Sequence, residues 1–194
     1  MKFISDFLSN YQKAISKLDQ KKIHSLVQIL KQTKKKNGRI FFLGVGGSAG
    51  NSSHAVNDFR KLCLIESYTP TDNVSEFSAR VNDEGLNTTF IEYLKVSKLT
   101  RNDCIFIFSV GGGDKRKGVS VNIIKALDYA KKIKCKTVSI VGRKNGYAGK
   151  KCDISVIIPN IQKNLMTPFA ESSQVLIWHL LVSHPELKKR NTKW

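Results

Sequence analysis

The sequence predicts one α/β domain of 194 residues, a three-layer α/β/α sandwich with a central, mostly parallel sheet and a long N-terminal helix. Two observations predict this class. Short apolar runs alternate along the chain with longer segments whose apolar residues recur every three or four positions, as strands and amphipathic helices do. The short runs are apolar throughout, which is typical of strands that helices cover on both faces. At this length we expect a single domain over residues 1–194.

The predicted elements follow one another in that alternating order. Residues 3–36 form the N-terminal helix, because one apolar stripe runs from Phe3 to Leu30, and Asn37-Gly38 ends it. The apolar runs that predict strands are residues 39–44, 103–109, 137–142 and 154–159. The later segments that predict helices are residues 51–64, 119–132 and 170–183.

The composition is basic, with 33 Lys and Arg against 15 Asp and Glu and a formal net charge of +18. Most of this excess is lysine scattered over helix faces, without interleaved aromatic residues or zinc-finger spacing. Specific nucleic-acid binding is therefore not expected. A solvated lysine-rich surface and a field that attracts small anions both account for the charge.

The chain also lacks the signals of membrane insertion and export. No apolar run reaches the roughly 18–20 residues of a membrane span, and the amphipathic N-terminus differs from a secretory signal. The cysteines are widely spaced along the chain, at Cys63, Cys104, Cys135 and Cys152. We therefore expect a cytoplasmic protein with reduced thiols and no membrane partner.

Two glycine-rich turns stand where predicted strands lead into helices. The first reads GVGGSAG over residues 44–50, and the second begins Ser-Val-Gly-Gly-Gly at Ser109. The first turn lacks the GK[ST] of a Walker sequence, and no acidic residue follows at the spacing that a dinucleotide site uses for the ribose. Backbone N–H groups, serine hydroxyls and helix N-termini instead favour a phosphate near Ser48 and between Ser109 and Ser120. A tight turn without a ligand is the alternative.

Two histidines and two carboxylates form a second constellation. His54 and Asp58 share a helix face, while His179 stands in an apolar helix, where it needs a partner. Glu171 precedes His179 by two helical turns, about 12 Å along the axis, so the two side chains would have to converge on one ion. Such a set suits Zn²⁺ or a similar divalent ion. The alternative is a hydrogen-bonded core histidine beside a surface His–Asp pair.

Five segments that contain these residues, in this order and spacing, resemble the sugar isomerase (SIS) domain family and, within it, the phosphoheptose isomerases. The segments are residues 44–48, 54–58, 82–83, 109–126 and 171–179. The resemblance extends over nearly the whole chain. It implies an aldose–ketose isomerase that converts sedoheptulose 7-phosphate into D-glycero-D-manno-heptose 7-phosphate for lipopolysaccharide or capsule synthesis. It also implies a homotetramer with zinc in the active site.

The resemblance further implies roles for individual residues. Metal ligands are implied at His54, Asp58, Glu171 and His179. The implied catalytic acid and base are Asp58 and His179. Positions that bind the substrate or its phosphate are Gly46, Gly47, Ser48, Asn82, Asp83, Ser109, Gly111, Gly112 and Ser120.

The first and last helices are more apolar than a small sheet requires. Residues 1–37 and the last helix, which includes Trp178, therefore suit a helical subunit interface, with the N-terminal segment used in oligomerisation. The alternative is that both helices only cover their own sheet.

The sequence departs from the family pattern at several positions. Val45 stands where the family has asparagine, Asp58 where it has glutamate, and Glu171 where it has glutamine. The second turn carries an insert over residues 114–118, and its cations are Lys115, Arg116 and Lys117. These cations either close over a phosphate or form a solvated loop tip. The departures leave two alternatives open: an isomerase for another phosphorylated sugar, and a non-catalytic SIS protein that binds a sugar phosphate or a protein partner.

Overall fold

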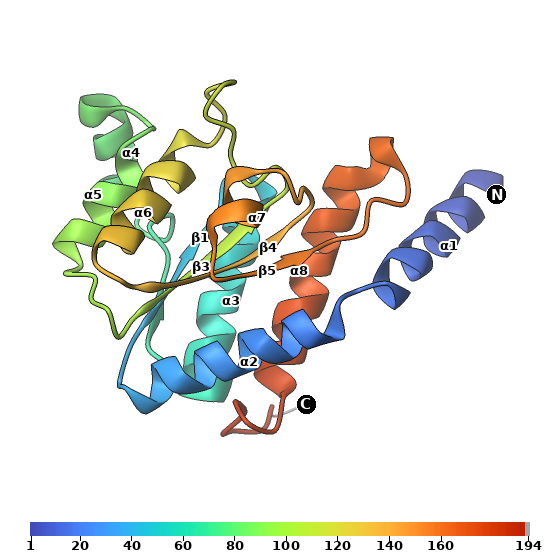
Figure 1. Cartoon of the computed structure of the whole chain (residues 1–194), viewed down its shortest axis with the longest axis horizontal. Coiled ribbons are helices and arrows are strands. Elements are labelled where there is room, and N and C mark those ends of the chain that lie inside the picture. Colours follow the sequence, from blue (N-terminus) through green and yellow to red (C-terminus); the bar gives the residue numbers. More distant parts are fainter. Residues whose placement is uncertain (193–194) are drawn as a thin grey trace.

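Five parallel strands form the sheet at the centre of the computed structural model, which describes residues 1–192 (Figure 1). The strands are β1 (Ile40–Leu43), β2 (Ser67–Tyr68), β3 (Cys104–Ser109), β4 (Lys136–Val141) and β5 (Ile154–Ile157). They lie in the order β2-β1-β3-β4-β5, and each neighbouring pair is parallel. The four strands predicted from apolar runs are confirmed, whereas the short strand β2 was not predicted.

Helices cover both faces of this sheet. They are α1 (Lys2–Ser16), α2 (Gln20–Lys35), α3 (Gly47–Cys63), α4 (Val74–Glu84), α5 (Thr89–Val96), α6 (Val121–Lys132), α7 (Tyr147–Lys151) and α8 (Met166–Ser183), with a 3₁₀ turn at Lys163–Leu165. Core residues of α2, α3 and α8 pack on one face, and core residues of α5, α6 and α7 pack on the other. The predicted three-layer α/β/α sandwich is therefore confirmed.

Successive side chains of β1 point to opposite faces, as the two-residue period of a strand requires. Phe42 packs against Phe59 of α3 and Phe106 of β3, with ring centroids 5.3 and 5.1 Å apart. Phe41 faces the other layer, where its ring lies 6.4 Å from that of Tyr93. Both side chains are fully buried, so replacing either phenylalanine with alanine is expected to cost about 3–5 kcal/mol. These contacts fix α3 against the strand that precedes it.

The N-terminal segment forms two helices, so the prediction of one long helix over residues 3–36 is wrong in this respect. The Asp19 carboxylate accepts a hydrogen bond from the Lys22 N–H at 3.0 Å and so caps the start of α2. The sequence carries this break as a step of five between Leu18 and Ile23, which interrupts the three-and-four spacing of the apolar stripe. As a result α1 departs from the line of α2 and projects beyond the sheet (Figure 1).

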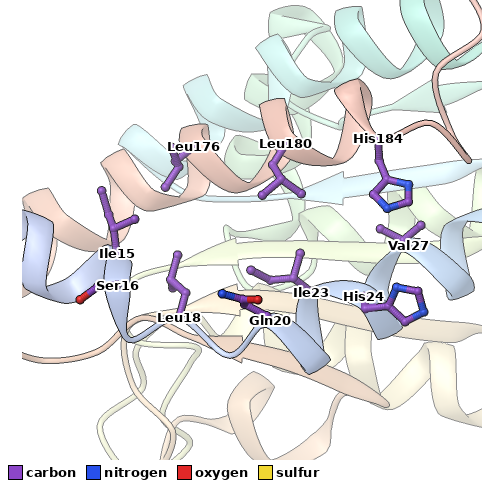
Figure 2. A pocket seen from close by; sticks show the side chains of 10 residues that line it. All are labelled: Ile15, Ser16, Leu18, Gln20, Ile23, His24, Val27, Leu176, Leu180 and His184. Atoms are coloured by element: carbon purple, nitrogen blue, oxygen red, sulfur yellow. The ribbon is translucent and has the colours of Figure 1, made fainter.

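An apolar groove of about 560 Å³ lies between the two N-terminal helices and α8 (Figure 2). Ile15 and Leu18 line one side, and Leu176 and Leu180 of α8 line the other. The groove therefore lies between apolar side chains of the N-terminal segment and apolar side chains of α8. None of the helices within residues 1–192 has the length and apolarity that crossing a membrane requires.

Candidate active site

Both glycine-rich turns lie at the carboxyl ends of two neighbouring central strands, at the point where the order of the strands reverses. β1 lies between β2 and β3, and its last residue, Leu43, is in register with Ile107 of β3. Ligands of open α/β sheets bind outside the carboxyl ends of the strands at such a reversal. Because Gly44 follows β1 and Ser109 ends β3, the two turns predicted to bind phosphate are neighbours in the fold.

The first turn passes directly into α3, which begins at Gly47 rather than at the predicted residue 51. Gly46 has a φ of +63°, a conformation that favours glycine. The carboxylate of Glu171, from α8, lies against Gly47, since a Cβ on that glycine would be 2.6 Å from Glu171 Oε2. The N-terminal end of α3 therefore already holds a negative charge, which the helix dipole stabilises. Ser48, a predicted phosphate ligand, is buried in the same turn.

Asn51 of α3 holds α8 beside this first turn. Its Nδ2 donates hydrogen bonds to the backbone oxygen of Glu171 at 3.1 Å and to Oε1 of Gln174 at 2.9 Å. Sequence reasoning missed both Asn51 and Gln174. The available signal was a polar residue within an apolar helix, because a buried amide such as that of Gln174 needs a hydrogen-bonding partner.

The second turn is closed from within by Ser109 and held from outside by α7. The hydroxyl oxygen of Ser109 accepts a hydrogen bond from the Gly112 N–H at 2.9 Å. The carbonyl oxygens of Gly112 and Gly113 accept hydrogen bonds from the N–H groups of Ala148 and Tyr147. Both glycines have positive φ, +73° and +87°, which side-chain-bearing residues rarely adopt. The turn is thus shaped by its backbone.

The insert of the second turn forms a short hairpin that leads into α6. Asp114 and Val119 form an antiparallel bridge, with N–O distances of 2.9 and 3.1 Å. Ser120 follows in a left-handed conformation with a φ of +51°, and α6 begins at the next residue. Such a conformation is uncommon for serine and marks a functional or constrained position. Ser120 therefore stands at a helix N-terminus, where phosphate is favoured.

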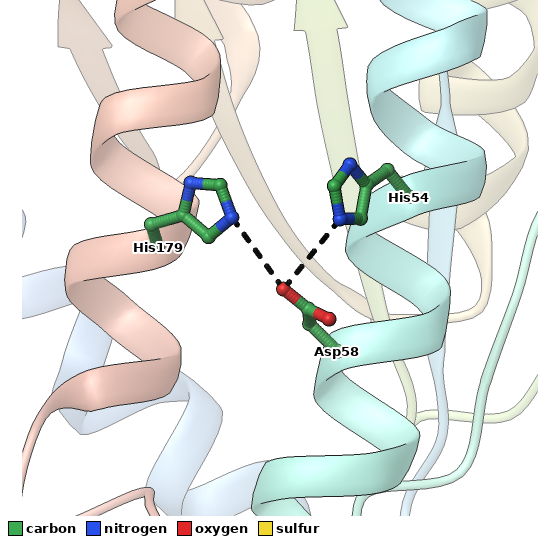
Figure 3. Close-up of side chains that lie close together, drawn as sticks. All are labelled: His54, Asp58 and His179. Carbon is green, nitrogen blue, oxygen red and sulfur yellow. Dashed lines mark ion pairs between the residues drawn. The ribbon is translucent and has the colours of Figure 1, made fainter. Parts of the chain in front are cut away.

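Two histidines and one aspartate converge between α3 and α8 (Figure 3). Asp58 Oδ2 lies 3.9 Å from His54 Nε2 and 3.6 Å from His179 Nε2. One ligand atom from each residue lies within 4.8 Å of the other two. The structure thus brings together three of the four predicted metal ligands, and with them the predicted acid–base pair of Asp58 and His179.

The aspartate is the most buried member of this group, and the imidazoles are accessible. The side chain of Asp58 is 13% exposed, against 58% for His54 and 48% for His179. Partial burial lowers the pKa of His179; Asp58 opposes this shift and His54 adds to it. His179 is therefore neutral at neutral pH, the form that binds a metal or accepts a proton.

Trp178 supports the histidines from the protein interior. It is fully buried, and its ring centroid lies 4.6 Å from that of His54. Trp178 is thus part of the core of its own chain, and the expectation that the last helix forms a subunit interface stays a prediction. A rigid indole behind His54 restricts the orientation of the imidazole, and such packing is what holds a site in its productive geometry.

The donor set fits zinc. Imidazole nitrogen and carboxylate oxygen both bind this ion, with bonds of about 2.0–2.2 Å in a tetrahedral arrangement that sets ligand atoms about 3.3 Å apart. The distances from Asp58 Oδ2 to the two imidazole nitrogens are 3.6 and 3.9 Å. Small rotations of the exposed imidazoles would close this difference.

Other predicted site residues do not join this group within one chain. The carboxylate of Glu171, the predicted fourth ligand, lies against Gly47 instead. Asn82 and Asp83 are exposed on α4, where Asn82 Nδ2 donates to Asp83 Oδ1 at 2.7 Å. In Figure 1, α4 and α1 stand at opposite ends of the molecule. The predicted substrate-binding roles of these residues therefore stay predictions.

The fold and its two glycine-rich turns define a class of protein, the SIS domain proteins. The SIS domain family model matches residues 3–142, and the chain belongs to this family. The resemblance to the SIS domain family is thereby confirmed.

Similar proteins include biosynthetic proteins and isomerases. The chain is 32% identical over 164 residues to the lincomycin biosynthesis protein LmbN of Streptomyces lincolnensis, a match that covers 81% of this chain but only 59% of LmbN. It is 26% identical over 167 residues to a phosphoheptose isomerase of Helicobacter pylori, covering 84% and 81% of the two chains. The phosphoheptose isomerase GmhA from Neisseria gonorrhoeae superposes with a TM-score of 0.79 at 19% identity, covering 93% of each chain, which shows a shared fold.

Proposed function

We propose that this chain is an aldose–ketose isomerase that converts sedoheptulose 7-phosphate into D-glycero-D-manno-heptose 7-phosphate through an enediol. The convergence of His54, Asp58 and His179 carries the proposal, because it offers a carboxylate and two imidazoles to one small region of a substrate. Relatives named phosphoheptose isomerase, at 26% and 28% identity, support the choice of substrate.

The reaction moves one hydrogen between neighbouring carbons. Starting from the ketose, a base removes a proton from C1, and the electron pair left behind forms the C1–C2 double bond of the enediol while the C2 oxygen gains a proton. The O1 hydroxyl then loses its proton as the C1 carbonyl forms, and C2 receives a proton. We assign these transfers to Asp58 and His179, whose facing atoms are 3.6 Å apart and so reach adjacent substrate atoms.

Zinc would be held by His54, Asp58 and His179, with Glu171 as the fourth ligand. Asp58 has a second carboxylate oxygen for proton transfer, whereas the Nε2 of His179 would hold either the ion or a proton at one time. When bound, the ion supplies positive charge that polarises the substrate oxygens and stabilises the enediolate. Glu171 would first have to leave Gly47, since its carboxylate lies against that glycine. The half-exposed imidazoles leave the site open to both metal and substrate.

The substrate phosphate is proposed to bind at the two glycine-rich turns, away from the chemistry. The residues assigned to it are Gly46, Gly47, Ser48, Ser109, Gly111, Gly112 and Ser120. His54 lies two helical turns from Gly47, about 10 Å along the axis of α3. A sugar phosphate carries its phosphate and its reacting carbons at opposite ends, so holding one end positions the other for reaction.

We also propose that the chain acts as a cytoplasmic homotetramer, with residues 1–37 used in oligomerisation. The exposed apolar side chains of Phe3, Ile4 and Leu8 on α1 support a contact with another copy. In such an assembly Asn82 and Asp83 would contact sugar hydroxyls in an active site shared between subunits. The product would supply heptose for capsule or lipopolysaccharide.

An isomerase for another phosphorylated sugar is the second candidate. The 32% identity to LmbN, a protein of lincomycin biosynthesis, favours it, as does the insert over residues 114–118. A panel of ketose phosphates of five to eight carbons separates the two candidates, because the preferred substrate has the highest kcat/KM.

The test is isomerisation of sedoheptulose 7-phosphate by the purified protein, with added zinc and with a chelator, followed by NMR of the product. The proposal predicts chelator-sensitive formation of the aldoheptose phosphate. Turnover of a different sugar phosphate would select the second candidate. Binding of sugar phosphates without turnover by zinc-loaded protein would reject both and indicate a non-catalytic SIS protein.

A further inference from the structure

A small pocket lies between the hairpin of the second turn and the loop that follows β4. Its volume is about 170 Å³, and its lining includes Lys117 of the hairpin and Arg143 of the loop. Pockets that take whole small molecules span about 300–1,000 Å³, so this one suits a single chemical group. Two cations in one small pocket indicate that the group is an anion.

Neither of these cations is neutralised by a partner within the described part of the chain. No carboxylate among residues 1–192 forms an ion pair with Lys117 or Arg143. Among the described residues, the Arg143 side chain makes one polar contact, a hydrogen bond from its Nε to the sulfur of Met166 at 3.5 Å. Both charges are therefore free to engage a ligand.

Two other charged residues of the hairpin, Lys115 and Asp114, already have partners. Lys115 Nζ lies 3.2 Å from Asp128 Oδ2 and 4.8 Å from the centroid of the Tyr147 ring, which ties the hairpin to α6 and α7. Asp114 also lines the pocket, but its Oδ1 accepts hydrogen bonds from the N–H groups of Arg116 and Lys117. The structure thus separates Lys117 from Lys115, although the sequence offered the hairpin cations as one group.

Three glycines line the pocket where its two backbone segments approach each other most closely. Gly111, Gly113 and Gly146 line it, and a Cβ on Gly146 would lie only 2.0 Å from the backbone oxygen of Gly111. The backbones of the second turn and of the β4–α7 loop are therefore in direct contact. This contact fixes the distance between the two segments that carry Lys117 and Arg143.

The two glycine-rich turns differ in charge. At the first, the carboxylate of Glu171 lies against Gly47, and a phosphate there would meet electrostatic repulsion until Glu171 moves to the metal. At the second, the pocket adjoins Val119, one residue before Ser120 and the N-terminus of α6. The second turn therefore attracts a dianion more strongly than the first.

We propose that Lys117 and Arg143 bind the phosphate of the sugar phosphate substrate in this pocket and so determine specificity for it. This inference rests on the proposed function for the identity of the ligand. It adds Arg143, which lies outside every motif found in the sequence, and it excludes Lys115 from phosphate binding.

The test compares Lys117→Ala and Arg143→Ala with Arg116→Ala, which removes the same charge from the same hairpin outside the pocket. Binding of inorganic phosphate and of sedoheptulose 7-phosphate is measured by titration calorimetry, alongside steady-state kinetics. We expect each pocket variant to weaken binding of both ligands and to raise KM by about tenfold, with kcat little changed. Arg116→Ala should behave like the native chain, and Arg143→Lys should recover part of the loss because it keeps the charge.

Binding and turnover keep the two proposals separable. If both pocket variants bind phosphate as tightly as the native chain, the inference is overturned whatever the activity. If the native chain turns over no sugar phosphate but loses phosphate binding in both pocket variants, the phosphate site stands and the proposed reaction fails. Native circular dichroism and thermal melting of each variant exclude unfolding as the cause.

Discussion

The two ends of the proposed site differ in structure: helix side chains form the end assigned to the reaction, and backbone turns form most of the end assigned to phosphate binding. The reacting end consists of His54, Asp58 and His179, side chains of two packed helices that are backed by the buried ring of Trp178. The holding end is made mainly of backbone, with positive-φ glycines in the second turn, a hairpin, and cations that extend from loops. Packing therefore fixes the groups assigned to chemistry, whereas turn geometry fixes the groups assigned to binding.

Because of this difference, substitutions at the two ends are expected to change different kinetic constants. A side chain that acts in the transition state lowers kcat when it is removed. A phosphate ligand far from the reacting carbons contributes equally to ground state and transition state, so its removal raises KM.

The largest effect is expected at the reacting end. Asp58→Asn and His179→Ala should each lower kcat about 10³-fold, because each removes a side chain that is assigned both to proton transfer and to zinc binding. Product formation is measured by NMR. Glu92→Gln is the matched control for Asp58→Asn, since Glu92 lies on α5 over the other face of the sheet and pairs with Lys95, and it should retain native turnover. Near-native kcat in both site variants would contradict the assignment.

Removal of zinc from the reacting end is expected to lower the free energy of unfolding of the chain. Zinc that binds only the folded chain adds about 2.7 kcal/mol to the free energy of unfolding at a free concentration 100 times its Kd. For a chain of this size that shift is about 5–10 °C in Tm. Calorimetric melting with and without zinc measures it. His54→Ala should abolish the shift, and a shift of native size in that variant would exclude His54 as a ligand.

A matched pair of glycine substitutions tests the holding end against the first turn. In Gly146→Ala the new Cβ would meet the backbone oxygen of Gly111 at 2.0 Å, so we expect a loss of about 2 kcal/mol in the free energy of unfolding. In Gly47→Ala the atoms nearest to the new Cβ belong to the flexible end of Glu171, which can turn away, so the loss should stay below about 1 kcal/mol. Urea unfolding measures both values, and the reverse order would contradict this reading of the two turns.

The smallest effect concerns pH. Because burial lowers the pKa of His179 below its ordinary value of 6.5, the unfolded chain binds the proton more readily than the folded chain. The resulting stability is present above pH 6.5 and is lost as the pH falls through the lower pKa of the folded state. Urea unfolding of metal-free protein from pH 8 to pH 5 should therefore show decreasing stability. His179→Gln should reduce this slope, whereas an unchanged slope would assign it to other groups.

The fold was largely predictable because its strands are continuous apolar runs. Strand β2 was not predicted because it has only two residues. Helix α4 was not predicted because none of its residues is fully buried, so no strong apolar period marks it in the sequence. The break between α1 and α2 had a signal, the step of five between Leu18 and Ile23, but the capping role of Asp19 identifies it more directly.

The candidate site was less predictable, because its residues meet across the fold. The four-residue spacing of His54 and Asp58 places them on one face of α3, but only the packing of α8 against α3 brings His179 to them. The position of Glu171 against Gly47 depends on the same packing, and no spacing in the sequence encodes it. Arg143 had no signal, since its pocket exists only where the β4–α7 loop contacts the second turn.

The most direct test of the central claim is isomerisation of sedoheptulose 7-phosphate by zinc-loaded native protein in deuterated water, followed by NMR. We expect the native chain to form aldoheptose phosphate that carries solvent deuterium at C2, and we expect no such product from Asp58→Asn or His179→Ala. Absence of conversion by the native chain, or equal deuterium incorporation by the native chain and both variants, would contradict the central claim.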